Sequence, residues 1–301
     1  MRIGAMFDID QPIDDVVAQV ASMASSGIES AWASQIFGYD ALTVLAIIGR
    51  EVPDIGLGTA VVPTYPRNPV MLAAQALTVQ AATGDRLTLG IGLSHQVVIE
   101  NVFGLSFDKP ARHMREYLSI LLPLIEGEQV SFAGETLRAS TFGPLGITAA
   151  PAPVLVAALG KAMLRIAGRM ASGTITWMTG ATTIETHTVP IIREAAAEAG
   201  RPEPRVAVGL PVCVTADVDS ARAKAAEVFA IYGTLPSYRA MLDREGAPGP
   251  ADVAIVGNAA EVAAEIRRFA EIGATDFCGA PFGSGKEISA SIEVLAGLVG
   301  A

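Results

Sequence analysis

Short apolar stretches alternate with longer amphipathic stretches along the whole chain. Several short ones, such as LTLGIGL and PVLVAAL, are almost continuously apolar, which is typical of parallel strands covered on both faces. Glycine readily adopts the left-handed conformation that ends a helix, and four predicted helices end at Gly27, Gly84, Gly200 and Gly273. The pattern predicts eight strands, each followed by helix, over residues 2–8, 30–36, 56–62, 87–93, 153–159, 173–178, 205–214 and 275–280.

The number and spacing of these elements predict an α/β protein with one (β/α)8 TIM barrel over residues 1–301. Two modest domains would also fit the length, but the regular alternation favours the single barrel. Insertions follow the fourth and seventh strands, over residues 94–152 and 216–274. The first contains the helical stretch RHMREYLSILLPLIEG and a predicted hairpin around Ala133 and Gly134. We expect both insertions to cover the mouth of the barrel.

The composition of the chain argues against several classes of protein. No apolar run in the 301 residues reaches the roughly 18 residues that span a bilayer, and the start MRIGAMFDI lacks the pattern of a signal peptide. We therefore expect a cytoplasmic protein without a membrane partner. The net charge of −10, with no basic cluster longer than the pair Arg267 and Arg268, argues against nucleic-acid binding. Cys213 and Cys278 stand far apart in apolar surroundings and predict neither a disulfide framework nor a metal site.

One histidine stands at the end of a predicted strand. In a barrel, reactive groups lie where strands end and the following loops begin. The stretch GDRLTLGIGLSHQ places Ser94 and His95 at that point, so we interpret His95 as a site residue, with a packing or capping role as the alternative. We interpret His113 as a structural partner within a helix and His187 as a surface residue.

A second candidate follows the fifth strand, where Gly160 and Lys161 open a helix in the stretch ALGKAML. Free backbone N–H groups, the helix dipole and an ammonium group converge there, which suits a phosphate. The alternative is that Lys161, Arg165 and Arg169 form a solvated stripe at helical spacing.

The stretch GAPFGSGKE after the eighth strand looks like a phosphate-binding P-loop. Ala280 stands where the first glycine is required, and Glu287 replaces the Ser or Thr that would hold magnesium. This pattern excludes the NTPase motif. The motifs HExxH and GxSxG are absent from the sequence, so metal hydrolysis and triad chemistry have no support.

Several ordered motifs together resemble the luciferase-like monooxygenase superfamily, and within it the branch of oxidoreductases that use the deazaflavin coenzyme F420. The resemblance runs almost from end to end. The motifs are RIGAMFD, AWASQIFGYDALT, GLGTAVVPTYPRNP, DRLTLGIGLSHQVVIENVFG, RHMREYLSILLPLIEGEQVSFAGE, and AALGKAMLRIAG followed by SGTITW.

The resemblance implies that the cofactor ring lies at the C-terminal mouth of the barrel. The ring would rest against a bulge in the third strand with a cis peptide between Ala60 and Val61, and the phosphate of the cofactor tail would bind at residues 157–161. By motif position, the implied cofactor-binding residues are Ser34, Gln35, Ile36, Ala60, Val61, Leu93, Ser94, His95, Ala157, Ala158, Leu159, Gly160 and Lys161.

The sequence departs from the sugar-phosphate dehydrogenases of this family. They carry an Asp-His pair after the second strand, where this chain has Gln35 and Ile36, and an acidic residue after the fourth strand, where this chain has His95. The resemblance therefore does not imply a sugar-phosphate substrate, and it makes His95 the candidate catalytic group. Deazaflavin carries carbon in place of the reactive ring nitrogen of flavin, so it transfers hydride and does not activate oxygen.

Three functions remain open at this point. The first is an F420-dependent oxidoreductase that acts on a small organic substrate, the second an FMN-dependent monooxygenase, and the third a non-catalytic flavin-binding protein. We also expect a homodimer, because the helix over residues 41–49 has no charged residue and the helix over residues 70–82 is apolar around nearly its whole circumference. Related family members commonly dimerise through this region. The alternative is that neighbouring loops of the same chain cover these faces.

Overall fold

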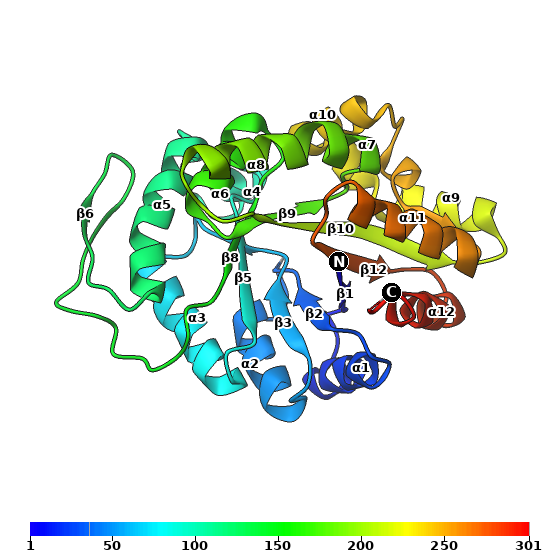
Figure 1. The fold of residues 1–301 in the computed structure, drawn as a ribbon, viewed down its shortest axis with the longest axis horizontal. Helices are drawn as coiled ribbons and strands as arrows, with labels where there is room; N and C mark the ends of the chain where they lie inside the picture. The colour runs from blue at the N-terminus through cyan, green and yellow to red at the C-terminus, as the bar shows by residue number, and fades with distance from the viewer. Residues whose placement is uncertain (36, 301) are drawn as a thin grey trace.

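Parallel strands follow one another around a closed ring in the computed structural model, which describes residues 1–35 and 37–300 (Figure 1). The ring closes because β12 pairs with both β1 and β10, while β9 pairs with β8 and β10. Its strands are β1 (Arg2–Met6), β2 (Ser30–Ala33), β3 (Gly56–Thr59), β5 (Leu87–Gly92), β8 (Val154–Ala157), β9 (Gly173–Trp177), β10 (Arg205–Val214) and β12 (Asp276–Pro281). The predicted (β/α)8 barrel is confirmed.

Helices surround this ring, and the four glycines expected to end them all have positive φ angles, from 63° at Gly200 to 103° at Gly273. The barrel helices are α1 (Ile13–Ser25), α2 (Ala41–Glu51), α3 (Pro69–Thr83), α5 (Pro110–Ile125), α6 (Lys161–Met170), α8 (Val189–Glu198), α11 (Ala259–Glu271) and α12 (Gly285–Ala296). Within the described residues, none of the helices has the length and apolar character needed to span a bilayer.

The third strand is interrupted at the predicted bulge. The Ala60–Val61 peptide is cis, as expected, and the strand resumes as β4 (Val62–Pro63), which pairs with β5. A Cβ added to Gly90 of β5 would lie 2.0 Å from the carbonyl oxygen of Thr59. Glycine is therefore required at this point for the two backbones to approach each other.

Ion pairs close the N-terminal end of the barrel. The buried carboxylate of Asp276 lies 3.0 Å from Arg2 Nε and 2.7 Å from Arg205 Nη2, so both of its neighbours neutralise it. Above this layer a separate apolar cluster fills the interior; it consists of Trp32, Leu155, Ile175, Ala207 and Cys278. The end that remains for a ligand is the opposite one, where the strands finish.

The position of the first insertion differs in part from our prediction. It contains α4 (Gln96–Asn101) and the antiparallel hairpin of β6 (Ser131–Ala133) and β7 (Arg138–Ser140). The hairpin lies outside the barrel (Figure 1), where Glu116 of α5 accepts the backbone N–H groups of Thr136 and Leu137 at 2.7 and 2.9 Å. The prediction that this whole insertion covers the mouth is wrong for the hairpin, because the carboxylate of an outer helix holds it there.

The second insertion does reach the mouth. It is built from α9 (Val218–Val228), η2 (Ala230–Gly233), α10 (Pro236–Glu245), η3 (Pro250–Asp252) and β11 (Ile255–Gly257), followed by α11. The short strand β11 pairs with the outer half of β10 and was not predicted. Between β9 and α8 lie α7 (Ala181–Thr183) and the π-helical turn η1 (Ile184–Thr188).

Candidate functional site

Aromatic side chains line the mouth of the barrel. Trp177, the last residue of β9, lies with its ring 6.1 Å from Phe229 and 5.9 Å from Tyr232 of the second insertion. Tyr232 in turn packs at 5.0 Å against Tyr238 of α10. Burial raises the pKa of both tyrosine hydroxyls. This wall is therefore uncharged at neutral pH, and sequence reasoning did not identify it.

His95 lies at this wall. Its ring is half-buried, 5.7 Å from the ring of Tyr238, and burial lowers its pKa. Ser94 has a φ of +60°, so the chain turns sharply just before the histidine. His95 is also the N-cap of α4, and no side-chain capping bond forms there among the described residues. The imidazole therefore does not cap α4 within the described residues, and it stays a candidate for ligand contact.

The residues expected beside the cofactor ring come together around the bulge. Ala60 and Val61 pack on the apolar cluster of the barrel interior. A Cβ added to Gly92 would lie 2.7 Å from Val61 Cγ2 and 3.2 Å from Ala157 Cβ. The third, fourth and fifth barrel strands therefore meet here through small side chains, just below Leu93.

The loop after β2 is tied to the same bulge. The backbone N–H of Gln35 donates to the carbonyl oxygen of Val61 at 3.4 Å. The Gln35 side chain accepts the N–H of Ala41 at 2.7 Å and donates to the carbonyl oxygen of Tyr39 at 3.3 Å. Its amide therefore shapes the loop that carries Ser34. Ile36, the third residue expected in this loop, lies outside the described residues.

The start of α6 has unsatisfied backbone donors. Gly160 is its N-cap, and no side chain caps the helix among the described residues. A Cβ added to Gly160 would meet no described atom within 4 Å, so a ligand can approach the backbone closely. Lys161 is exposed beside it, whereas Ala158 is fully buried. Free N–H groups, helix dipole and ammonium favour an anion at this point.

His187 contacts the segment just before α6, at Leu159. Our interpretation of His187 as a surface residue is wrong. His187 is only 7% exposed, and its Nε2–H donates to the carbonyl oxygen of Leu159 at 2.9 Å. Burial lowers its pKa; the bond to Leu159 opposes this effect, and the charges of Arg244 and Lys161 reinforce it. The π-helical turn that directs His187 inward leaves no periodic signal in the sequence.

His113 has the structural role expected of it. Its ring stacks on Tyr65 at 3.9 Å with an angle of 4° between the planes, and its Nε2 hydrogen-bonds with Thr64 Oγ1 at 3.0 Å. Burial lowers its pKa to about 4, so it is neutral at pH 7. Its contacts hold the loop after β4 against α5.

Comparison with known proteins identifies the family. The profile of the luciferase-like monooxygenase family matches residues 1–276. The chain belongs to this family. A curated relative, the 5,10-methylenetetrahydromethanopterin reductase of Methanolobus tindarius, is 26% identical over 263 residues, which cover 86% of this chain and 79% of the relative.

Two solved structures share the fold. The coenzyme F420-dependent tetrahydromethanopterin reductase of Methanopyrus kandleri superposes with a TM-score of 0.84 at 23% identity, covering 99% of both chains. The oxygenating constituent of 3,6-diketocamphane monooxygenase of Pseudomonas putida, in complex with FMN, superposes with a TM-score of 0.78 at 17% identity. That alignment covers 99% of this chain and 97% of the other. At these identities the likeness concerns the fold alone.

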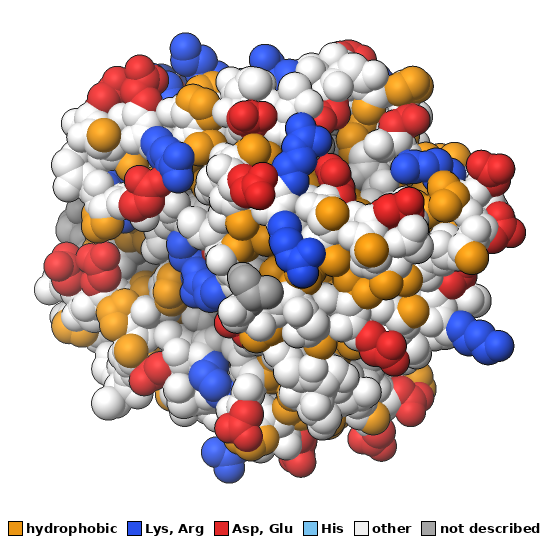
Figure 2. Space-filling model, turned by 45° about the vertical axis from the view of Figure 1, so that its right-hand side comes forward, with side chains coloured by type: hydrophobic (Ala, Val, Ile, Leu, Met, Phe, Trp, Pro, Cys, Tyr) orange, Lys and Arg blue, Asp and Glu red, His pale blue; other side chains and the backbone are white. Residues whose placement is uncertain are grey.

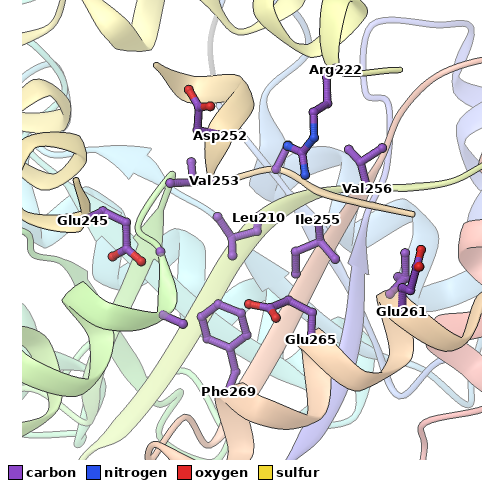
Figure 3. A pocket seen from close by; sticks show the side chains of 14 residues that line it. Leu210, Arg222, Glu245, Asp252, Val253, Ile255, Val256, Glu261, Glu265 and Phe269 are labelled. Carbon is purple, nitrogen blue, oxygen red and sulfur yellow. The ribbon is translucent and has the colours of Figure 1, made fainter. Parts of the chain in front are cut away.

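A separate cavity of about 280 Å³ lies away from the barrel interior, between β10 and the outer helix α11 (Figure 3). Carboxylates surround it, but the chain itself uses most of them. Glu245 accepts the N–H groups of Thr182 and Thr183 at 3.0 and 2.7 Å, and Glu261 accepts the N–H of Asn258. We assign this cavity no part in the candidate site.

Charge and metal binding add no further site. Acidic and basic side chains are interspersed over the face shown in Figure 2, without an extended patch of one sign. Over residues 1–35 and 37–300, no group of three or more His, Cys, Asp or Glu side chains could hold a metal ion. Both cysteines are free and buried.

Proposed function

We propose that this protein is an F420-dependent oxidoreductase that transfers a hydride between the deazaflavin and a small organic substrate. The observation that carries the proposal is the uncapped start of α6 at Gly160, which opens beside the mouth that holds His95. A reductase relative and an F420-dependent enzyme of the same fold support the choice of coenzyme.

The described residues fit such a coenzyme. Ala60 and Val61 form a packed apolar surface at the bulge, on which a planar ring would lie, with Ser34 and Gln35 on one side and Leu93 and Ser94 on the other. The phosphate of the tail would bind to the backbone of Leu159 and Gly160 and to the ammonium of Lys161. When bound, deazaflavin supplies a carbon that gives or takes hydride.

His95 would handle the proton that accompanies the hydride. Reduction of a carbonyl or imine requires a proton at the heteroatom, and oxidation releases one. The imidazole can hold that proton at a ring nitrogen, and its lowered pKa makes the neutral form prevail at pH 7. The uncharged wall of Tyr232 and Tyr238 lies beside it.

Titration of the apo-protein with F420 and with FMN, each followed by fluorescence, separates the two cofactors. Tight F420 binding with weak FMN binding supports the proposal. The reverse result would support the FMN-dependent monooxygenase, which the FMN-bound structure of the same fold keeps as the second candidate. F420 binding without oxidation of the reduced coenzyme across carbonyl, alkene and imine substrates would instead favour a non-catalytic binding protein.

We further propose that residues 1–301 act as one domain and associate as a homodimer. The chain itself covers much of the apolar circumference of α3, since Leu77 and Val79 are only 3% and 2% exposed. An uncharged stripe of α3 faces outward at Met71, which is 67% exposed, and at Thr78. Sedimentation of the wild type and of Met71→Glu tests the dimer, and a wild type that stays monomeric at micromolar concentration contradicts it.

A further inference from the structure

The aromatic wall at the mouth continues directly from His95. The ring of Tyr238 lies 5.7 Å from His95 and 5.0 Å from Tyr232. The ring of Trp177 lies 5.9 Å from Tyr232 and 6.1 Å from Phe229. Trp177, Tyr232 and Phe229 are each only partly buried, so part of each ring can meet a ligand. A series of rings therefore crosses the mouth from the candidate proton-handling group.

This wall is uncharged at neutral pH, and charged side chains beside it are engaged within their own segments. Arg239 follows Tyr238 in α10 and donates to the carboxylate of Asp243 and to two backbone carbonyl oxygens, each at 2.8 Å. On α4, which follows the histidine, the carboxylate of Glu100 accepts the amide of Gln96 at 3.1 Å. The wall itself thus offers a ligand aromatic faces and edges instead of a counter-charge.

Exposed apolar side chains gather at the same end of the barrel. Among the described residues, all of the exposed large apolar side chains except Met71 and Phe142 belong to segments that follow β2, β5 or β10. Covering such side chains with a ligand is favourable, and a cluster of them marks a contact surface. We call this set the apolar rim; it consists of Phe37, Tyr39, Val97, Val102, Phe103, Leu105, Val228 and Ile231.

The rim and the wall belong to the same segments of the chain. Val97 stands two residues after His95, and Ile231 stands between Phe229 and Tyr232 of the wall. The apolar surface therefore extends from solvent to the candidate proton-handling group, which favours a small-molecule ligand that enters the site.

We propose that the mouth binds an uncharged substrate with a planar, mainly apolar body, namely an aromatic or fused-ring ketone or the corresponding alcohol. The proposal rests on the proposed function and names the substrate class of the same site. The planar body would lie against Trp177 and Tyr232, with the oxygen toward His95. Aromatic side chains favour such a body, whereas a carboxylate or phosphate buried there without a partner would be costly.

The reaction balances with the groups already named. The carbonyl carbon would accept the hydride of the reduced coenzyme, and the carbonyl oxygen would accept a proton from His95. The products are the alcohol and the oxidised coenzyme, and oxidation of the alcohol is the reverse of this step.

The test measures binding, so it does not depend on turnover. Calorimetry on protein loaded with oxidised F420, which has no hydride to give, yields dissociation constants for three ketones: methyl naphthyl ketone, the same ketone with a carboxylate on its distal ring, and cyclohexanone. The first two differ by one charge, and the first and third differ by the planar rings. We expect the methyl naphthyl ketone to bind about tenfold more tightly than either of the others.

The wall is tested by two changes at one residue. Trp177→Leu removes the flat ring and should weaken binding of the naphthyl ketone about fivefold to tenfold, with cyclohexanone little affected. Trp177→Phe restores an aromatic face and should recover most of the affinity. Phe142→Leu is the matched control, because Phe142 is a fully exposed aromatic side chain just beyond the hairpin. Thermal unfolding of all three variants checks that the fold is intact.

The rim is tested at Val97, which is 54% exposed, so that a charged side chain there does not disturb packing. Val97→Lys should improve binding of the carboxylate-bearing ketone up to about fivefold, and Val97→Glu should weaken it by a similar factor. Sedimentation should be unchanged in both variants. Altered association with unchanged ketone binding would assign the rim to contact between protein chains and overturn its place in the substrate site.

The remaining outcomes separate this proposal from the proposed function. Equal affinity for the three ketones in the wild type, or tighter binding of the carboxylate-bearing one, would overturn the substrate class alone. A preference for the naphthyl ketone that survives Trp177→Leu would overturn the role of the wall. Failure of oxidised F420 to bind would overturn the proposed function and this proposal with it.

Discussion

The dipeptide Gly-Lys stands at the start of two helices of this barrel, α6 and α12, and the two starts differ in how their first turn is capped. At α12 the side chain of Ser284 accepts the N–H of Glu287 at 3.4 Å, and the Glu287 carboxylate accepts the N–H of Ser284 at 2.7 Å. At α6 the N-cap is Gly160, and no described side chain caps the helix. One helix start satisfies its own donors, whereas the other leaves them for a ligand.

The comparison shows why the two stretches need different interpretations. GAPFGSGKE looks more like a phosphate-binding motif than ALGKAML does, yet its Glu287 occupies the place that an anion would take. His95 extends the contrast, since it too stands at a helix start without a capping bond. The unsatisfied donors and the imidazole of His95 lie at the ends of neighbouring strands β5 and β8.

The largest expected effect is at His95. His95→Ala removes the proton-handling group and should lower turnover by about 10²- to 10⁴-fold, while the dissociation constant of the coenzyme changes little. Steady-state kinetics and a binding titration on the same preparation measure the two effects. Unchanged turnover would reduce His95 to a residue that only lines the mouth.

The pH profile sharpens this test. Burial lowers the pKa of His95 from its ordinary value near 6.5, so the protonated fraction falls as pH rises through that lower pKa. Turnover in the direction that consumes a proton should therefore fall as the pH rises, and the midpoint of this fall should lie below pH 6.5. In His95→Gln this fall should vanish, and a profile identical to the wild type would contradict the assignment.

The two lysines provide the most direct comparison. Lys161→Glu replaces a charge-assisted hydrogen bond with repulsion and should weaken coenzyme binding by about 1–3 kcal/mol, roughly 5- to 150-fold. Lys286→Glu makes the same change at the self-capped start of α12 and should leave binding unaltered. Equal losses in both variants would show a general charge effect instead of a site.

Gly160→Asp would convert the open helix start into a closed one. Aspartate is among the best N-cap residues, the backbone angles of −78° and 152° suit it, and its side chain meets open space. We expect a gain of a few tenths of a kcal/mol in unfolding free energy and a loss of coenzyme affinity on the order of tenfold. Calorimetry on the apo-protein measures the stability, and a binding titration measures the affinity for the coenzyme. An undiminished affinity would place the phosphate elsewhere.

The smallest effect is expected at the closed helix start. Ser284→Ala removes the cap of α12 and should lower the unfolding free energy by about 0.5–2 kcal/mol, with coenzyme affinity unchanged. Denaturant unfolding gives the first quantity. A loss of affinity comparable to that of Lys161→Glu would break the contrast between the two helices.

Much of the fold could be predicted from the sequence, because the strands of this barrel are buried on both faces and leave continuous apolar runs such as LTLGIGL. The rule that ligands meet the ends of strands led to His95 and Gly160. The same reasoning missed Trp177 and Tyr238, since aromatic residues at strand ends and in helices are common in ordinary cores. Their shared wall exists only because an insertion folds back over the mouth.

The sequence by itself determined the order of strands and helices, the glycines that end helices, and the dipeptides that begin them, because these features depend on neighbours along the chain. The tertiary structure decided which of them matter. It buried His187 under Leu159, placed the β6–β7 hairpin outside α5, and covered Leu77 within its own chain. Those outcomes depend on contacts between distant segments. Local periodicity does not indicate which distant group will accept a given hydrogen bond or which will cover a given apolar face.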